Sequence, residues 1–274
     1  MIKLLAIDMD GTLLNEEKHI DTPQKEAVQK AIEDGIKVVL CTGRPLFGVL
    51  PVYGELELEK YNLDEYVILN NGCSLRKTTN WELLDNKEIT KEDVIYLDKL
   101  RKGYNLDLTV SNDNDYFVVG DKANKYTIED GKLVYVDIKP ISLEEATSGK
   151  HTFFKSMYLG EEEEIQRFKN DNENLLKDKY DAVLSQIHIF EMLPFGTNKA
   201  AALKELAEKL GIEREEIMTI GDGNNDVEML EFAGIGVAMG NGTESAKKAA
   251  NYVTDTNENH GVAKAIEKYI LSKN

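Results

Sequence analysis

The sequence is poor in cysteine and in long apolar stretches. Two cysteines, Cys41 and Cys73, in a chain of 274 residues cannot build the disulfide framework of a small secreted domain. No apolar stretch approaches the length of a membrane span, and Asp8 interrupts the N-terminal apolar run before it reaches the length of a signal peptide. We therefore expect a cytoplasmic protein that has no membrane partner.

Basic residues are also scarce relative to acidic ones. The chain has 33 Lys and Arg against 50 Asp and Glu, and its formal net charge is −17. This balance excludes a general basic surface for nucleic acid, so a phosphorylated ligand needs a local positive site. The sequence has no Walker A pattern, and Gly234-Ile235-Gly236 is not followed by the third glycine of a dinucleotide fingerprint. Oligomeric state cannot be read from these features.

Strands and helices alternate at both ends of the chain. Strands are expected at 2–8, 36–41 and 66–69, with a helix capped by Thr22-Pro23 and another after Pro45. The same rhythm returns near the C-terminus, where the sequence predicts helices at 198–210, 225–233 and 262–271 and strands at 217–220 and 236–238. Strands that alternate with helices predict a parallel sheet covered on both faces.

The middle of the chain has a different pattern. Short alternating runs predict strands, polar pairs predict turns, and two stretches predict helices. The expected strands are 106–110, 116–119, 133–136 and 152–159, the turns are Asp113-Asn114 and Asp130-Gly131, and the helices are 91–102, capped by Thr90, and 161–179. We predict an α/β protein whose Rossmann-like parallel-sheet core, residues 1–82 and 194–274, is split by an inserted mixed α+β domain, residues 83–193.

Two carboxylates follow the first predicted strand. The run Leu4-Leu5-Ala6-Ile7 leads into Asp8-Met9-Asp10-Gly11-Thr12. Like charges this close resist ionisation unless a cation lies between them, and carboxylate oxygens suit a hard cation such as Mg²⁺. The plain alternative is a strand followed by an Asp-Gly turn.

Other predicted strand ends carry residues suited to the same chemistry. Ligands of an open parallel sheet lie beyond the carboxyl ends of its strands. A carboxylate there can attack phosphorus, and Asp222 and Asp226 add further ligands for Mg²⁺. Thr42 offers a hydroxyl, Gly43 an accessible N–H, and Arg44 and Lys199 positive charge for phosphate oxygens. Together these residues predict phosphoryl transfer.

At this point the chain resembles a known family. The motifs Asp8-Met9-Asp10-Gly11-Thr12, Thr42-Gly43-Arg44, Lys199 and Gly221-Asp222-Gly223-Asn224-Asn225-Asp226 occur in the order typical of haloacid dehalogenase-like phosphatases. Within that superfamily the chain is similar to the Cof-type sugar-phosphatase branch. The resemblance covers nearly the whole chain. One departure is Ala200, which follows Lys199 where the family often has glycine.

The resemblance implies a role for each motif residue. Asp8 would be the nucleophile and Asp10 the general acid and then base. Asp8, Asp222, Asp226 and the backbone carbonyl of Asp10 would hold the Mg²⁺ cofactor, Asp226 directly or through water. Thr42, Gly43, Arg44, Asn71, Lys199 and Asn225 would bind the phosphoryl group or face the substrate. The insertion would be the family's α/β cap, which selects the substrate.

We therefore expect a Mg²⁺-dependent phosphatase that hydrolyses small phosphorylated metabolites, above all sugar phosphates, through an aspartyl-phosphate. One alternative is a phosphotransferase that resembles phosphomannomutases. Such an enzyme needs cap arginines for a second phosphate, and Arg76, Arg101 and Arg167 form no cluster in the sequence. Another alternative is a non-catalytic phosphosugar-binding protein, which would have no use for both Asp8 and Asp10.

Overall fold

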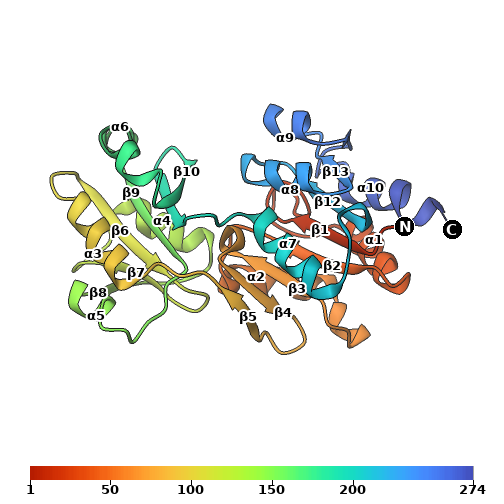
Figure 1. Ribbon diagram of the computed structural model, residues 1–274, viewed down its shortest axis with the longest axis horizontal. Helices are drawn as coiled ribbons and strands as arrows, with labels where there is room; N and C mark the ends of the chain where they lie inside the picture. Colours follow the sequence, from red (N-terminus) through yellow and green to blue (C-terminus); the bar gives the residue numbers. More distant parts are fainter. Residues whose placement is uncertain (274) are drawn as a thin grey trace. The chain divides into compact units, whose positions relative to one another are not determined.

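The computed structural model describes residues 1–273, and they form two compact units. Unit 1 comprises Met1–Gly43, Val49–Asp85 and residues 198–273, and unit 2 comprises Arg44–Gly48 and Asn86–Thr197. Each unit has its own sheet (Figure 1). Each also has its own cluster of buried apolar side chains. Unit 1 is therefore assembled from both ends of the chain, whereas unit 2 is nearly continuous.

Unit 1 contains an eight-stranded sheet among the described residues, in the order β14-β13-β12-β1-β2-β3-β4-β5. Neighbouring strands from β14 to β3 are parallel, and β4 runs antiparallel to β3. This confirms the expected α/β class with a parallel-sheet core. The strands are β1 Leu4–Asp8, β2 Lys37–Cys41, β3 Tyr66–Leu69, β4 Ser74–Lys77, β5 Leu83–Asn86, β12 Ile217–Gly221, β13 Ile235–Ala238 and β14 Tyr252–Val253.

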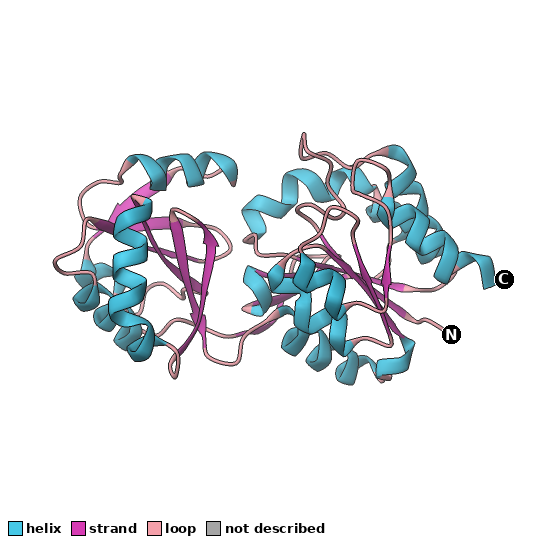
Figure 2. Ribbon diagram, turned by 90° about the horizontal axis from the view of Figure 1, so that it is seen from above, coloured by secondary structure: helices cyan, strands magenta, loops and turns pink. Residues whose placement is uncertain are grey.

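Helices cover the unit 1 sheet, as the view in Figure 2 shows. They are α1 Thr22–Glu33, α2 Leu46–Tyr53, α7 Lys199–Leu210, α8 Val227–Phe232, α9 Glu244–Ala249 and α10 Gly261–Tyr269. The N-cap of α1 is Asp21, one residue before the expected Thr22, and Pro23 lies in the first turn. Helix α2 belongs largely to unit 1, although its first residues cluster with unit 2.

Strand β1 forms the centre of the unit 1 core. All five of its residues are buried. Leu4 and Ala6 pack in one cluster with Leu203 and Leu206 of α7. Because successive side chains of a strand point to opposite faces, the alternate residues of β1 face the other layer. An apolar run that is buried on both faces explains why this strand has no polar residue before Asp8.

Unit 2 contains a mixed sheet of six strands among the described residues, in the order β10-β11-β9-β6-β7-β8. Its neighbouring strands are antiparallel, except that β7 and β8 are parallel. The strands are β6 Leu106–Ser111, β7 Tyr116–Val119, β8 Ile138–Ile141, β9 Lys155–Gly160, β10 Tyr180–Gln186 and β11 Ile189–Pro194. The helices are α3 Lys91–Leu100, α4 Lys125–Leu133, α5 Leu143–Ala146 and α6 Glu162–Leu176.

Within residues 1–273, no helix is both long enough and apolar enough to cross a bilayer.

The sequence-based prediction was wrong around residue 130. The expected strand 133–136 and the expected turn at Asp130-Gly131 are replaced by helix α4, which ends at Leu133, and by strand β8, which begins at Ile138. Gly131 does not mark a turn here. A side chain at this position would place its Cβ 2.8 Å from the Cδ1 atom of Ile138, so close packing of the helix requires glycine.

Glu65 is a buried carboxyl group just before strand β3, at the amino ends of the unit 1 strands. Its Oε2 accepts a hydrogen bond from the N–H of Val38, and its Oε1 lies 3.8 Å from the Nζ of Lys37. Burial raises the pKa of Glu65 to about 7, and the adjacent Asp64 adds to this, while Val38 and Lys37 oppose it. The folded state therefore binds the Glu65 proton more tightly than the unfolded state does.

The substitution Glu65→Gln should make stability less dependent on pH. The wild-type contribution is complete below the ordinary pKa of 4.5 and is lost as pH rises through about 7. The variant removes the ionisation, so it should gain up to about 3 kcal/mol relative to wild type above that range. Urea denaturation on both sides of the window measures the change, with the exposed Glu59→Gln as control. Parallel pH profiles for wild type and Glu65→Gln would contradict the assignment.

Candidate active site

The candidate site lies at the carboxyl ends of β12, β1 and β2, three adjacent parallel strands (Figure 1). Asp8 is the last residue of β1 and pairs in register with Cys41, the last residue of β2. Thr42 directly follows β2, and Asp222 directly follows β12. The parallel sheet therefore brings together side chains from opposite ends of the sequence.

Lys199 is completely buried between two carboxylates. Its Nζ donates to Asp8 Oδ1 at 2.6 Å and to Asp226 Oδ1 at 2.7 Å, and its side chain is 0% exposed. Lys199 is the first residue of α7, whose N-cap Asn198 accepts a hydrogen bond from the N–H of Ala201. The capped helix start fixes the backbone of Lys199, so the ammonium group is held where the two acids converge.

Burial and neighbouring charges shift the pKa values of Asp8, Asp222 and Lys199. Burial, followed by repulsion from Asp226, raises the pKa of Asp8 well above its ordinary value, and Lys199 opposes the rise. Burial also raises the pKa of Asp222. Burial alone would lower the pKa of Lys199, but attraction to Asp226 and Asp8 outweighs it and raises that pKa. One lysine cannot neutralise three carboxylates, so the fully ionised cluster needs further positive charge.

The donor set fits a hard divalent cation. Asp8, Asp222 and Asp226 each offer a carboxylate oxygen, and the three oxygens lie within 4.8 Å of one another. These are oxygen donors alone, the kind that Mg²⁺ prefers. Asp226 is the most constrained of the three, because its Oδ2 accepts hydrogen bonds from the N–H groups of Asp222 at 2.9 Å and Gly223 at 2.8 Å.

Asp10 differs from Asp8 in its exposure. Its side chain is 40% exposed, and its Oδ1 accepts a hydrogen bond from Lys18 Nζ at 2.9 Å. Gly11 follows with φ +79°, and a Cβ there would lie 2.4 Å from Asp222 Oδ2. Only glycine fits this conformation and this close approach. The loop can therefore pass next to the carboxylate cluster while it presents the Asp10 side chain away from the core.

Thr42, Gly43, Asn71 and Asn225 also lie together in unit 1. The Nδ2 of Asn225 donates to Asn71 Oδ1 at 2.9 Å, and the N–H of Asn71 donates to the carbonyl of Thr42 at 2.9 Å. A Cβ at Gly43 would lie 3.2 Å from both terminal atoms of the Asn71 side chain. Asn71 has a left-handed conformation with φ 55°, which asparagine tolerates well.

Arg44 is placed differently from the other predicted site residues. It begins the short segment Arg44–Gly48, which clusters with unit 2. Its side chain is largely buried, and its Nη1 donates to the carbonyl of Gly48 at 2.9 Å. The division between the two units therefore falls within the Thr42-Gly43-Arg44 motif.

Two residues near the site were given no role by the sequence reasoning. The Oγ1 of Thr12 donates to Asp222 Oδ1 at 2.9 Å and so links the first motif to the last. Thr12 could have been identified, because it stands in the Asp8–Thr12 motif. Lys18, the partner of Asp10, could not, because nothing in the sequence indicates that the chain returns to Asp10 at that residue.

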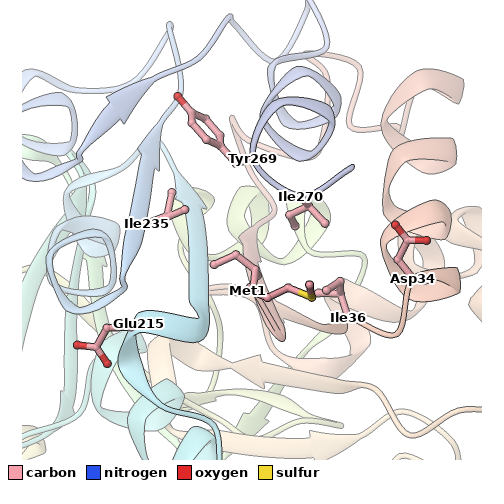
Figure 3. A pocket seen from close by; sticks show the side chains of 8 residues that line it. Met1, Asp34, Ile36, Glu215, Ile235, Tyr269 and Ile270 are labelled. Carbon is pink, nitrogen blue, oxygen red and sulfur yellow. The ribbon is translucent and has the colours of Figure 1, made fainter. Parts of the chain in front are cut away.

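A pocket separate from the carboxylate cluster lies near the amino ends of the unit 1 strands (Figure 3). Met1 and Ile2 precede β1, and Ile36 precedes β2. The lining is mainly apolar, and its charged side chains, Asp34 and Glu215, are acidic. Among the described residues, no Lys or Arg lines this pocket, whereas Lys199 is buried at the carboxyl ends of the strands, which therefore remain the candidate site.

Known proteins resemble the chain over its whole length. YxeH of Bacillus subtilis is 33% identical over 100% of both chains. The 5-amino-6-(5-phospho-D-ribitylamino)uracil phosphatase YcsE of the same organism is 33% identical, with 98% of this chain and 96% of YcsE covered. Among solved structures, a haloacid dehalogenase-like hydrolase from Bacteroides thetaiotaomicron has a TM-score of 0.87 at 30% identity, covering 98% of this chain and 99% of its own. The subclass IIB sugar phosphatase BT4131 has a TM-score of 0.81 at 27% identity, and the match covers 97% of this chain and 98% of the BT4131 chain.

The fold and these relatives define the class: the protein is a hydrolase of phosphoric monoesters, a phosphatase. The family model described as haloacid dehalogenase-like hydrolase matches residues 5–266. The chain therefore belongs to the haloacid dehalogenase-like hydrolases. This confirms the family resemblance seen in the sequence, and phosphatases of this family generally use a divalent metal.

The substitution Lys199→Met should strongly destabilise the metal-free protein. It removes the buried positive charge and leaves Asp8 and Asp226 unpaired, which should cost about 3–5 kcal/mol. Lys204→Met, at an exposed position of the same helix, should change stability by less than about 0.5 kcal/mol. Chemical denaturation in EDTA measures both variants. Similar small changes in the two would show that Lys199 does not offset the buried charge.

Proposed function

We propose that the protein is a Mg²⁺-dependent phosphatase that hydrolyses small phosphomonoesters, above all sugar phosphates, through an aspartyl-phosphate on Asp8. The observation that carries this proposal is the cluster of Asp8, Asp222 and Asp226 around the buried Lys199. Such a cluster combines a carboxylate nucleophile, a positive charge for phosphate oxygens and oxygen ligands for a hard cation.

Asp8 is the proposed nucleophile. Lys199 holds one carboxylate oxygen of Asp8, Oδ1, and the second oxygen would attack phosphorus. The new bond joins an Asp8 oxygen to phosphorus while the bond from phosphorus to the leaving oxygen breaks. Water then attacks the same phosphorus, the bond to Asp8 breaks, and the products are inorganic phosphate and the restored carboxylate. Lys199 would neutralise negative charge in both steps.

Asp10 is the proposed proton carrier. In the first step it would give a proton to the leaving oxygen, and in the second it would take a proton from the attacking water. Its greater exposure supports this role, because a group that alternates between two protonation states must reach both the leaving group and water. The burial of Asp8 and the exposure of Asp10 thus separate the roles of two acids in one motif.

Four groups would hold Mg²⁺: the carboxylates of Asp8 and Asp222, the backbone carbonyl of Asp10, and Asp226. We propose that Asp226 acts through water, because both of its oxygens already accept hydrogen bonds within the protein. When bound, the cation would add positive charge next to the phosphoryl oxygens. Thr42, Gly43, Arg44, Asn71 and Asn225 are the proposed phosphate- and substrate-binding residues, together with Lys199.

We propose that residues 83–193 act as the cap that chooses the substrate. BT4131 is named as a sugar phosphatase, and YcsE as a phosphatase of a phosphorylated ribityl compound, which supports a small phosphorylated polyol as substrate. Hydrolysis is favoured over the mutase reaction because the arginines have other partners. Arg101 pairs with Asp98, and Arg167 pairs with Glu164.

Asp8→Asn should abolish Mg²⁺-dependent phosphate release and leave the fold intact. Asparagine keeps an oxygen for Lys199 but cannot form the phosphoenzyme. A panel of sugar phosphates, 5-amino-6-(5-phospho-D-ribitylamino)uracil, a nucleotide and pyridoxal phosphate, each with Mg²⁺ or EDTA, measures the effect and ranks the substrates. Asp178→Asn, at an exposed position in unit 2, is the matched control.

Either of two results would count against this assignment. Near-normal turnover by Asp8→Asn would remove Asp8 as the nucleophile. No release from any substrate by wild type would favour the mutase, which a sugar bisphosphate then tests, and afterwards a non-catalytic phosphosugar-binding protein.

Asp10→Asn should slow both half-reactions, because one group serves as acid and then as base. Loss of acid–base help is expected to cost about 10²–10⁴-fold. Rapid-quench measurement of phosphoenzyme formation and breakdown tests the two steps separately. Unchanged rates in both steps would refute the role of Asp10.

A further inference from the structure

The loop that follows Asp10 has an unusual set of hydrogen-bond partners. The four successive carbonyls of Gly11, Thr12, Leu13 and Leu14 all accept hydrogen bonds from side-chain amides. The donors are Asn241 Nδ2 to Gly11 at 2.8 Å, Gln24 Nε2 to Thr12 at 3.5 Å and to Leu13 at 3.0 Å, and Asn257 Nδ2 to Leu14 at 2.9 Å. The three amides come from three separate parts of unit 1, so no single element accounts for the pattern.

The N–H groups of the same loop are also satisfied. Thr12 and Leu14 donate to the carbonyl of Met9 at 3.3 and 2.9 Å, and Leu13 donates to the carbonyl of Asp8 at 3.3 Å. Every peptide group from residue 12 to 14 thus has both a donor and an acceptor partner. The loop therefore has a single backbone path, although it contains no helix or strand.

The amides are themselves held in place. Gln24, on α1, is fully buried, and its Oε1 accepts from the N–H of Ala263 on α10 at 3.3 Å. Asn257 is 6% exposed, and its own N–H donates to Asn241 Oδ1 at 3.0 Å. Both ends of the side-chain amide are thus used in Gln24 and in Asn241, and Asn257 is tied to Asn241 through its backbone N–H. This two-ended bonding fixes the orientation of the donor groups toward the loop.

We propose that Asn241, Asn257 and Gln24 are positioning residues for Asp10, and we call them the amide clamp. Asp10 stands directly before the four clamped carbonyls and forms a bridge with Leu14. Its side chain is partly exposed, so packing of the carboxyl group does not fix it. The amide clamp fixes the backbone from which that side chain extends. This inference rests on the proposed acid–base role of Asp10.

The amide clamp matters because Asp10 has to serve two steps in one geometry. The leaving oxygen and the attacking water occupy the same side of the phosphoryl group in turn, and proton transfer to each requires hydrogen-bond distance. A misplacement of about 1 Å can cost about a hundredfold in rate. The amides act at carbonyls, not at the carboxyl group, so they fix its position and leave it open to protons.

Asn241→Ala is the first test, because Asn241 is exposed and its loss should leave the fold intact. The variant removes the hydrogen bond from Asn241 to the Gly11 carbonyl and the one from the N–H of Asn257 to Asn241. We expect kcat to fall about ten- to a hundred-fold with little change in KM. In rapid-quench experiments, phosphoenzyme formation from a sugar phosphate should slow more than formation from p-nitrophenyl phosphate, whose leaving group needs little acid help.

Asn259→Ala is the matched control. Asn259 is an exposed residue of the same loop as Asn257, and its Nδ2 donates to Thr256 Oγ1 at 3.0 Å, outside the amide clamp. Its rates should match wild type. Equal rates in Asn241→Ala and wild type would overturn the proposal. A loss that is equal for both leaving groups would also overturn it, because it would indicate fewer folded molecules instead of a displaced acid.

Asn257→Asp provides a second, near-isosteric variant. It replaces the donor to Leu14 with an oxygen that repels the carbonyl, and Asn259→Asp is its control for added charge. Both half-reactions should slow in Asn257→Asp, and the ratio of the two losses should resemble the ratio in Asn241→Ala. If wild type itself forms no phosphoenzyme, the proposed function fails. If wild type forms it and both clamp variants behave like their controls, only the amide clamp fails.

Discussion

The buried ion pair of Lys199 with Asp8 and Asp226 is the interaction on which the rest of unit 1 depends. Lys199 and Asp8 are 191 residues apart in sequence, so their contact requires both ends of the chain to be folded together. Burying charges is costly unless each has a partner, and here one ammonium group serves two carboxylates. The same contact that holds the two parts of unit 1 together leaves an excess of negative charge at the candidate site, which a divalent cation would offset.

Two aspartates separated by one residue have contrasting surroundings. Asp8 ends a strand that is buried on both faces, whereas Asp10 extends from a loop in which the N–H and carbonyl groups of residues 12 to 14 are hydrogen-bonded. The first environment raises the pKa of a carboxyl group and fixes it against a lysine. The second environment leaves the Asp10 side chain accessible to solvent. The backbone stays in the core here, since Met9 and Thr12 on either side are fully buried, and only the Asp10 side chain reaches the surface.

The sequence was sufficient to predict the strand ends that meet at the site, because parallel strands place their carboxyl ends at one edge of a sheet. Strand β7 and the Thr90 cap of α3 were also predicted, since both depend on local patterns. Helix α4 was missed because Gly131 serves close packing against Ile138, a contact that local sequence cannot indicate. Lys18 and Asn241 were missed for the same reason, since their partners are set by tertiary structure.

The strand order of unit 1 has a consequence for folding during synthesis on the ribosome. Strand β1 lies between β2 and β12, and Leu4 pairs with Ile217, which is made much later. Until Ile217–Gly221 leaves the ribosome, one edge of β1 has no strand to pair with. Residues 86–197 are complete before then and can fold as they emerge. During synthesis, unit 2 can therefore be folded before β1 pairs with β12. Until that pairing, β1 has an exposed edge, and aggregation is most favoured at this stage.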